Sequence, residues 1–257
     1  MRGERWSREE FILALNLYLK LPYGKMHKGN PQVQELARLM GRSVNTVSIR
    51  LSNFAACDPQ LKARGIAGME GGRKYCQPYW DEYENNKEGI IFESEQILAR
   101  LQNTSIETKY NRVLSEIPKE LNGETKVREV KVRVNQSVFR QMVIANYEGR
   151  CALTLIDLPE LLVASHIIPW ANNENERLNP ENGICLSSLY DKAFDRGLIT
   201  FDDDLRTIFS QRLKKQVSKP YYEECFKPLE NRQLIIPSKY NPNPEFLQWH
   251  RDVIFEH

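Results

Sequence analysis

The sequence between Leu161 and Phe201 reads LLVASHIIPWANNENERLNPENGICLSSLYDKAFDRGLITF. It opens with an apolar run of strand-favouring residues, which ends at Pro169 because proline cannot donate a hydrogen bond to a sheet. His166 therefore lies at or near the end of a predicted strand. Turn residues follow and finish with Asn182-Gly183. Apolar residues at helical spacing then place Asp191 on a short helix that packs against the strand.

The side chains of this strand–loop–helix segment are those of a hydrolytic site. A neutral histidine at His166 can take a proton from water near pH 7. The Asn182 amide both donates and accepts hydrogen bonds, so it can tie the loop back to the strand. A carboxylate at Asp191, close to the histidine, can hold Mg²⁺ or Mn²⁺ through oxygen. A base, a metal and a phosphate-sized gap are the parts that hydrolysis of a phosphodiester requires.

Residues from Cys151 to about Ser210 resemble the HNH endonuclease family in its ββα-metal form, through the motifs SHIIPW, NPENG and DKAFDRGLIT. The flanking segments are similar to those around this module in bacterial restriction-type HNH proteins. The resemblance implies a metal-dependent endonuclease of double-stranded DNA in which His166 is the general base and Asn182 is the middle asparagine. It also suggests a role in restriction or defence against foreign DNA, by analogy alone.

Two positions depart from the family pattern. Ser165 stands where family members usually have a metal-binding Asp or His, and Tyr190 stands in or next to the place of the last histidine. Asp191 is then the nearest strong ligand, with Asp195 and Asp157 in reserve. Such a site is rich in oxygen and poor in histidine, which favours Mg²⁺ or Mn²⁺ over Zn²⁺.

These departures keep other functions open. One alternative is a DNA-binding protein that carries a degenerate HNH fold without activity. Another is an RNA-directed or toxin-like nuclease. Loss of cleavage with retention of DNA binding, on replacing His166 by alanine, would distinguish an enzyme from a binding protein.

The composition restricts the possible functions and locations of the protein. The chain has 257 residues with a formal net charge of +2, so affinity for DNA has to come from local patches. The five cysteines form no CxxC pair, which makes structural zinc unlikely and favours free thiols in a reducing cytoplasm. No apolar run approaches the length of a membrane span.

The predicted fold class is α+β, with a helical domain at residues 1–86. Ser7 and Glu10 fit a capping box at the start of the first helix. A second helix begins at Pro31, and the glycine turn at Gly41 leads into a third helix. This order is typical of a helix-turn-helix domain, although an ordinary helical bundle has the same pattern. The predicted DNA contacts on the exposed face of the third helix and its turn are Arg42, Asn45, Ser48 and Arg50.

The rest of the chain is predicted as a linker followed by the catalytic domain. Residues 87–136 read as a linker with helical pieces and one strand, Arg128–Val134, where valine alternates with charge. Residues 137–257 form the HNH domain with its C-terminal tail. There, Cys151–Thr154 is predicted to pair with the His166 strand, and Arg150 to contact the DNA backbone. Because cutting both strands of DNA usually needs two sites, a homodimer is a further hypothesis.

Overall fold

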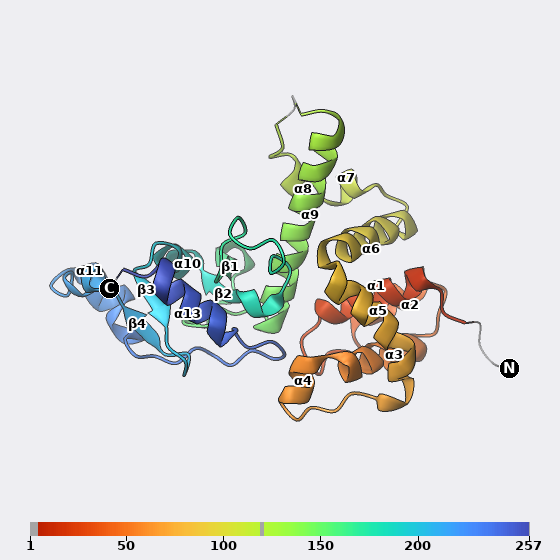
Figure 1. The fold of residues 1–257 in the computed structure, drawn as a ribbon, viewed down its shortest axis with the longest axis horizontal. Coiled ribbons are helices and arrows are strands. Elements are labelled where there is room, and N and C mark those ends of the chain that lie inside the picture. The colour runs from red at the N-terminus through yellow and green to blue at the C-terminus, as the bar shows by residue number, and fades with distance from the viewer. Residues whose placement is uncertain (1–4, 119–120, 257) are drawn as a thin grey trace. The chain divides into compact units, whose positions relative to one another are not determined.

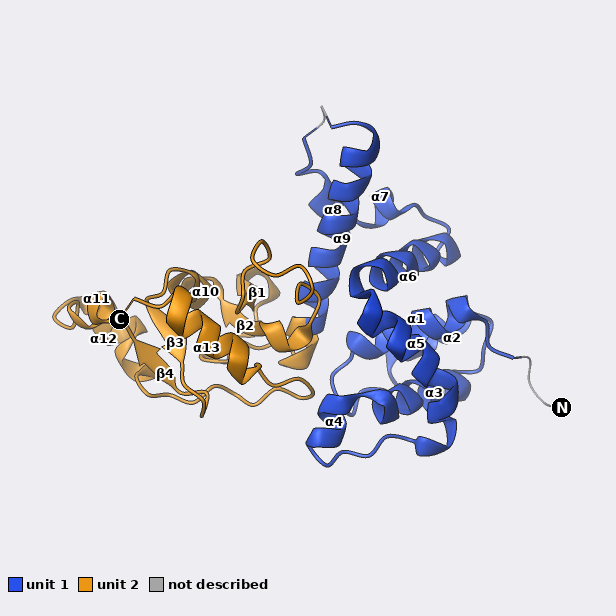
Figure 2. Cartoon of the chain, viewed as in Figure 1, with its two compact units in different colours: residues 1–142 blue, residues 143–257 orange. Residues whose placement is uncertain are grey.

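The computed structural model describes residues 5–118 and 121–256. The few positions of the predicted domains that fall at residues 1–4, 119–120 and 257 lie outside this description. Contacts divide the chain into two compact units, unit 1 at residues 1–142 and unit 2 at residues 143–257 (Figure 2).

Unit 1 is built from helices (Figure 1). Its first helix begins at Ser7, whose hydroxyl accepts from the Glu10 amide while the Glu10 carboxylate accepts from the Ser7 amide at 2.7 Å. The predicted capping box is therefore confirmed. The α-helices described between residues 5 and 101 are α1 (Arg8–Leu19), α2 (Pro31–Leu39), α3 (Val44–Cys57), α4 (Pro59–Ala63), α5 (Arg73–Asn85) and α6 (Lys87–Leu101).

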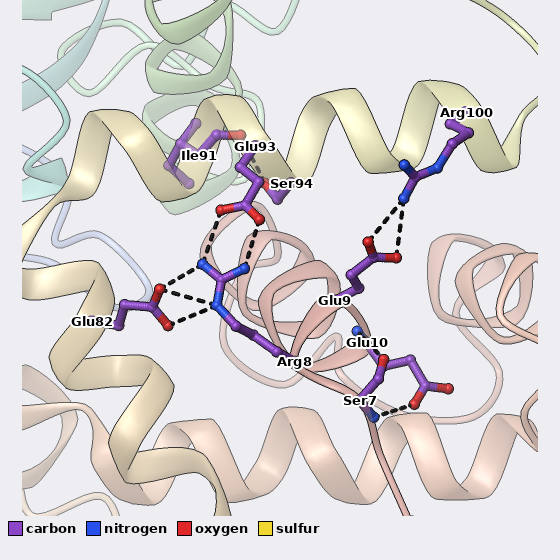
Figure 3. Close-up of polar contacts among 9 residues, drawn as sticks. All are labelled: Ser7, Arg8, Glu9, Glu10, Glu82, Ile91, Glu93, Ser94 and Arg100. Atoms are coloured by element: carbon purple, nitrogen blue, oxygen red, sulfur yellow. Dashed lines mark hydrogen bonds and ion pairs between the residues drawn. The ribbon is translucent and has the colours of Figure 1, made fainter.

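Ion pairs link the start of α1 to two of its neighbours, α5 and α6 (Figure 3). The Arg8 guanidinium donates to Glu82 of α5 and, at 2.6 Å, to Glu93 of α6. Arg100, near the end of α6, donates to the Glu9 carboxylate at 3.0 Å. These pairs are partly exposed, so each adds little to stability.

Three more α-helices are described after α6 in unit 1, and the prediction of a strand at Arg128–Val134 is wrong. This segment lies inside the long helix α9 (Gly123–Asn146), which is preceded by α7 (Ile106–Lys109) and α8 (Asn111–Leu114). Val130 and Val134 repeat at a spacing of four as well as of two, so they fit one helical face. Both are buried there against Ile106.

Unit 2 places two small antiparallel sheets around α10 (Figure 1). Strand β1 (Leu162–His166) pairs with β2 (Gly183–Ser187), and β3 (Ile199–Phe201) pairs with β4 (Thr207–Phe209). Cys151–Thr154 is a turn, so its predicted pairing with the His166 strand is wrong. The helices that complete the unit are α10 (Ser188–Asp195), α11 (Gln211–Lys214), α12 (Pro220–Cys225) and α13 (Pro244–Val253).

The core of unit 2 lies between β1, β2 and α10. Every residue of β2 is buried, as are Ala193 and Phe194 on the inner face of α10. The helical unit and the strand–strand–helix segment together give the predicted α+β fold class. Among the residues described, no helix is both long and apolar enough to cross a membrane.

Candidate active site

His166 is the last residue of β1 and lies opposite Gly183 of β2. Its Nε2 atom is 3.1 Å from the carbonyl oxygen of Arg177 in the loop between the two strands. A carbonyl oxygen only accepts, so Nε2 must carry the proton that is donated. In a neutral imidazole the other nitrogen, Nδ1, then holds the lone pair that can accept a proton.

The surroundings of His166 keep its ring neutral. Burial lowers the pKa of His166 to about 4, and the hydrogen bond to the Arg177 carbonyl opposes this shift only in part. The Trp170 ring meets the imidazole edge to face, with ring centroids 5.5 Å apart. The Arg177 guanidinium donates back to the Trp170 carbonyl at 2.8 Å. The loop thus holds one tautomer of an uncharged base.

Asn182 fastens the end of the loop to the residues that follow His166. Its side-chain oxygen accepts from the Ile168 amide at 2.8 Å. Its side-chain nitrogen donates to the carbonyls of Ile168 at 3.1 Å and Glu176 at 3.2 Å. Asn182 is only 1 % exposed, so water cannot take the place of these hydrogen bonds.

We expect Asn182→Ala to destabilise unit 2 by about 2 kcal/mol or more, because buried backbone groups of Ile168 would lose their partner. Chemical unfolding of the purified protein measures this loss. Asn182→Asp is the matched control, since it keeps the acceptor for the Ile168 amide and removes both donors. An alanine variant as stable as the wild type would contradict this role.

The helix α10 carries two carboxylates, Asp191 and Asp195, one turn apart and on the same side of the helix. Partial burial raises the pKa of both side chains, and the charge of Asp191 raises that of Asp195 further. The Ser165 hydroxyl of β1 opposes the shift at Asp191, although it makes no hydrogen bond of normal geometry. Two carboxylates that repel each other beside a buried hydroxyl suit a hard cation.

A cavity of about 330 Å³ brings these elements together. His166 and Asp195 both line it, with the positively charged Lys192 and Arg196 beside them. Asp191 does not line the cavity, and its link to the site is Ser165, the residue before the base. The cavity therefore joins a base, a carboxylate and two cations on one surface.

Tyr190 and Asp157 do not line this cavity. Tyr190, at or next to the position of the last histidine, donates its hydroxyl to the Cys225 carbonyl at 2.7 Å. It is 7 % exposed and packs edge to face on Phe226, as a core residue does. Asp157 is exposed and does not line the cavity.

Asp191 and Asp195 are the carboxylates of this region that could hold a metal ion. No cluster of three His, Cys, Asp or Glu side chains that could hold a metal occurs in residues 5–118 and 121–256. Mg²⁺ often keeps several waters and takes only one or two protein carboxylates besides substrate phosphate. Asp191 and Asp195 fit such a partial shell, and a cation there would relieve their mutual repulsion.

His250 of α13 is a residue of this region that the motifs did not indicate. It is 1 % exposed, stacks on Phe194 with ring centroids 3.7 Å apart, and also lines the cavity. Its Nε2 lies 3.1 Å from the Phe194 carbonyl, and its Nδ1 lies 3.0 Å from the Thr200 hydroxyl. Since the carbonyl must accept from Nε2–H, Nδ1 accepts from Thr200 and the ring is neutral.

We expect acid to destabilise unit 2 through His250. Burial lowers its pKa from 6.5 to about 4, so the stability present above about pH 6.5 is lost as the pH falls towards 4. A shift of this size corresponds to about 3 kcal/mol over the whole window, and His166 shifts in the same direction. Urea unfolding at about pH 7 and about pH 5 measures the loss.

His250→Gln, which keeps a donor and an acceptor but does not titrate, should flatten this pH dependence. His27→Gln is the matched control, because His27 is exposed in unit 1. Equal slopes for His250→Gln and the wild type would exclude His250 as the source.

In unit 1, the face predicted to contact DNA is largely occupied by the protein itself. The Arg42 guanidinium pairs with the Glu10 carboxylate at 2.6 Å. Arg50 stacks over the rings of Trp6 and Phe11 at 4.8 and 4.7 Å. The prediction of an exposed polar face at these positions is therefore corrected.

Of the other three predicted DNA contacts, two have exposed side chains and one is partly buried. Ser48 is partly buried and donates to the Met26 carbonyl at 2.7 Å, whereas Asn45 on α3 is exposed. Arg150 in unit 2 is also exposed. The role of all these residues towards DNA stays a prediction.

Comparison with known families gives an independent result for the same segment. The HNH endonuclease model matches residues 151–202, which hold β1, β2, α10 and both carboxylates. A search of curated proteins finds no significant match to the chain. Residues 151–202 of the chain therefore form an HNH endonuclease domain.

Proposed function

We propose that the protein is a metal-dependent endonuclease that hydrolyses phosphodiester bonds of double-stranded DNA. The observation that carries this proposal is the cavity in which His166 lies beside Asp195, Lys192 and Arg196. The HNH domain supports a nucleic acid as the substrate.

In this proposal each residue of the site has a separate role in the reaction. His166, with its lone pair on Nδ1, takes the proton of the attacking water. Lys192 and Arg196 hold the negatively charged phosphate in the cavity. Asn182 keeps the loop, and with it the carbonyl that orients His166, in place.

The proposed cofactor is Mg²⁺ or Mn²⁺, held by Asp191 and Asp195 with water and substrate phosphate completing its shell. When bound, the cation supplies Lewis-acid stabilisation of the negative charge that develops on the phosphate and on the leaving oxygen.

The proposal also covers DNA contacts, oligomeric state, biological role and location. Asn45 and Arg150 are offered as DNA contacts because their side chains are exposed. A homodimer would supply the second active site for the opposite strand, and sedimentation with and without duplex DNA tests it. Restriction or defence against foreign DNA is the proposed role. The proposed location is a reducing cytoplasm.

One observation favours a second function. Tyr190 is a core residue, and Ser165 is a weak ligand, so two positions that bind metal in the wider family do not supply strong ligands here. The second candidate is a DNA-binding protein with a degenerate HNH fold.

A plasmid-cleavage assay separates the two functions. An endonuclease converts supercoiled plasmid to nicked and linear forms with Mg²⁺ or Mn²⁺, and EDTA stops it. Unmodified and phage-modified DNA are both used as substrates. Binding without cleavage under every metal tested would support the second candidate.

A further inference from the structure

A second and larger cavity, of about 590 Å³, lies within unit 1. It shares no lining residue with the active-site cavity. Its walls are mainly apolar, with side chains from α1, α2, α6 and α8 such as Leu17, Leu36, Leu98 and Val113. This volume is in the range of sites that bind small organic molecules.

A buried ionic cluster lies at one side of this cavity. The Glu95 carboxylate is fully buried and accepts from Lys20, from Lys109 at 2.8 Å and from the Tyr110 hydroxyl at 2.7 Å. Burial opposes ionisation of Glu95, but the charges of the two lysines outweigh it and hold its pKa below the usual range. Two lysines around one carboxylate leave a positive charge in excess.

The cluster also contains a polar atom without a partner. Asn16 lines the cavity, is 2 % exposed and donates to Glu95 at 2.7 Å. Its side-chain oxygen makes no hydrogen bond. A buried acceptor left in this state is costly, and a donor group on a bound molecule would satisfy it. Arg112 adds a further positive charge to the lining, and the Glu35 carboxylate, which also lines the cavity, pairs with Arg38 at 2.7 Å.

We propose that this cavity binds a nucleotide unit, with its base against the apolar walls and its phosphate near Lys20, Lys109 and Arg112. The N–H groups of a base would meet the Asn16 oxygen. A fatty acid fits the walls and the charge but offers no donor to Asn16. A small polar anion has no apolar surface that could pack against the leucines of the cavity walls. This site goes beyond the proposed nuclease function.

A nucleotide unit could arrive free or as a base turned out of DNA, and one fluorescent base distinguishes the two sources. The probes are 2-aminopurine deoxyriboside monophosphate and a duplex with one central 2-aminopurine. Both are titrated into the full chain in EDTA, so the result does not depend on cleavage and its failure is separate from failure of the nuclease proposal. Decanoate is the competing amphiphile.

The variants are Lys109→Gln, which removes a charge, and Leu17→Trp, which fills the cavity without changing charge. Each should weaken binding of the probe by about tenfold or more. Lys62→Gln is the control, because Lys62 is exposed and does not line the cavity. Circular dichroism confirms that each variant folds.

Binding of either probe with this variant pattern supports the site. The free nucleotide alone would identify a soluble ligand, and the duplex alone would identify a base that leaves the helix. No binding of either probe to the folded wild type overturns the proposal. So does binding that Lys109→Gln and Leu17→Trp leave unchanged, or binding of decanoate in place of both probes.

Discussion

His166→Ala should lower the rate of metal-dependent plasmid cleavage by about 10²- to 10⁴-fold, the usual contribution of a general base. The reason is the hydrogen bond from Nε2 to the Arg177 carbonyl, which leaves the lone pair of the neutral ring on Nδ1. Alanine removes this atom without adding charge or bulk. Single-turnover cleavage at saturating metal measures the effect on the chemical step.

DNA binding by the His166→Ala variant, measured by fluorescence anisotropy, should stay within a few-fold of the wild type. His27→Ala is the matched control for loss of a histidine, because His27 is exposed in unit 1. Full activity of His166→Ala would assign the base to another residue. If even the wild type binds DNA but never cuts it, the degenerate-fold function replaces the nuclease.

The local part of this site follows from the sequence because it depends on short-range patterns. The apolar run before Pro169 predicts a strand that ends near His166, and β1 does end there. The helical spacing after the loop predicts a short helix that carries Asp191, and α10 has it in its first turn. Periodicity and proline placement decide both features within a few residues.

The pairing between distant segments was harder to predict from the sequence. Cys151–Thr154 is the nearest segment before β1, but β1 pairs with β2 across a longer loop that Asn182 closes. Strand partners depend on loop geometry that alternation of residues does not encode. Val130 and Val134 show the same limit, since their spacing fits a strand and a helix equally.

Long-range side-chain partners could not be predicted at all. Arg42 and Arg50 carry the charge that DNA contacts need, yet Glu10 and the ring of Trp6 engage them in the fold. His250 stands outside every motif, and only the packing of α13 brings it to Phe194. Lys192 and Arg196, by contrast, flank Asp195 in the motif DKAFDRG, and this position was a usable signal.

The second large effect concerns the carboxylates of α10. Asp195→Asn should lower cleavage by about 10³-fold, since the loss of several kcal/mol of metal stabilisation corresponds to such a factor. The amide keeps the shape of the side chain and removes its charge. Asp191→Asn should have an effect of the same order, because its carboxylate lies one turn away and is proposed to hold the same cation.

Metal dependence distinguishes loss of a ligand from loss of structure. Both variants should need a higher Mn²⁺ concentration for half-maximal cleavage, and calorimetry should show weaker Mn²⁺ binding. Asp204→Asn is the matched control, since Asp204 is exposed on the turn between β3 and β4. If that turn held the metal, this control would lose activity instead. If Asp191→Asn and Asp195→Asn kept the Mn²⁺ dependence of the wild type, the cation would have to lie elsewhere.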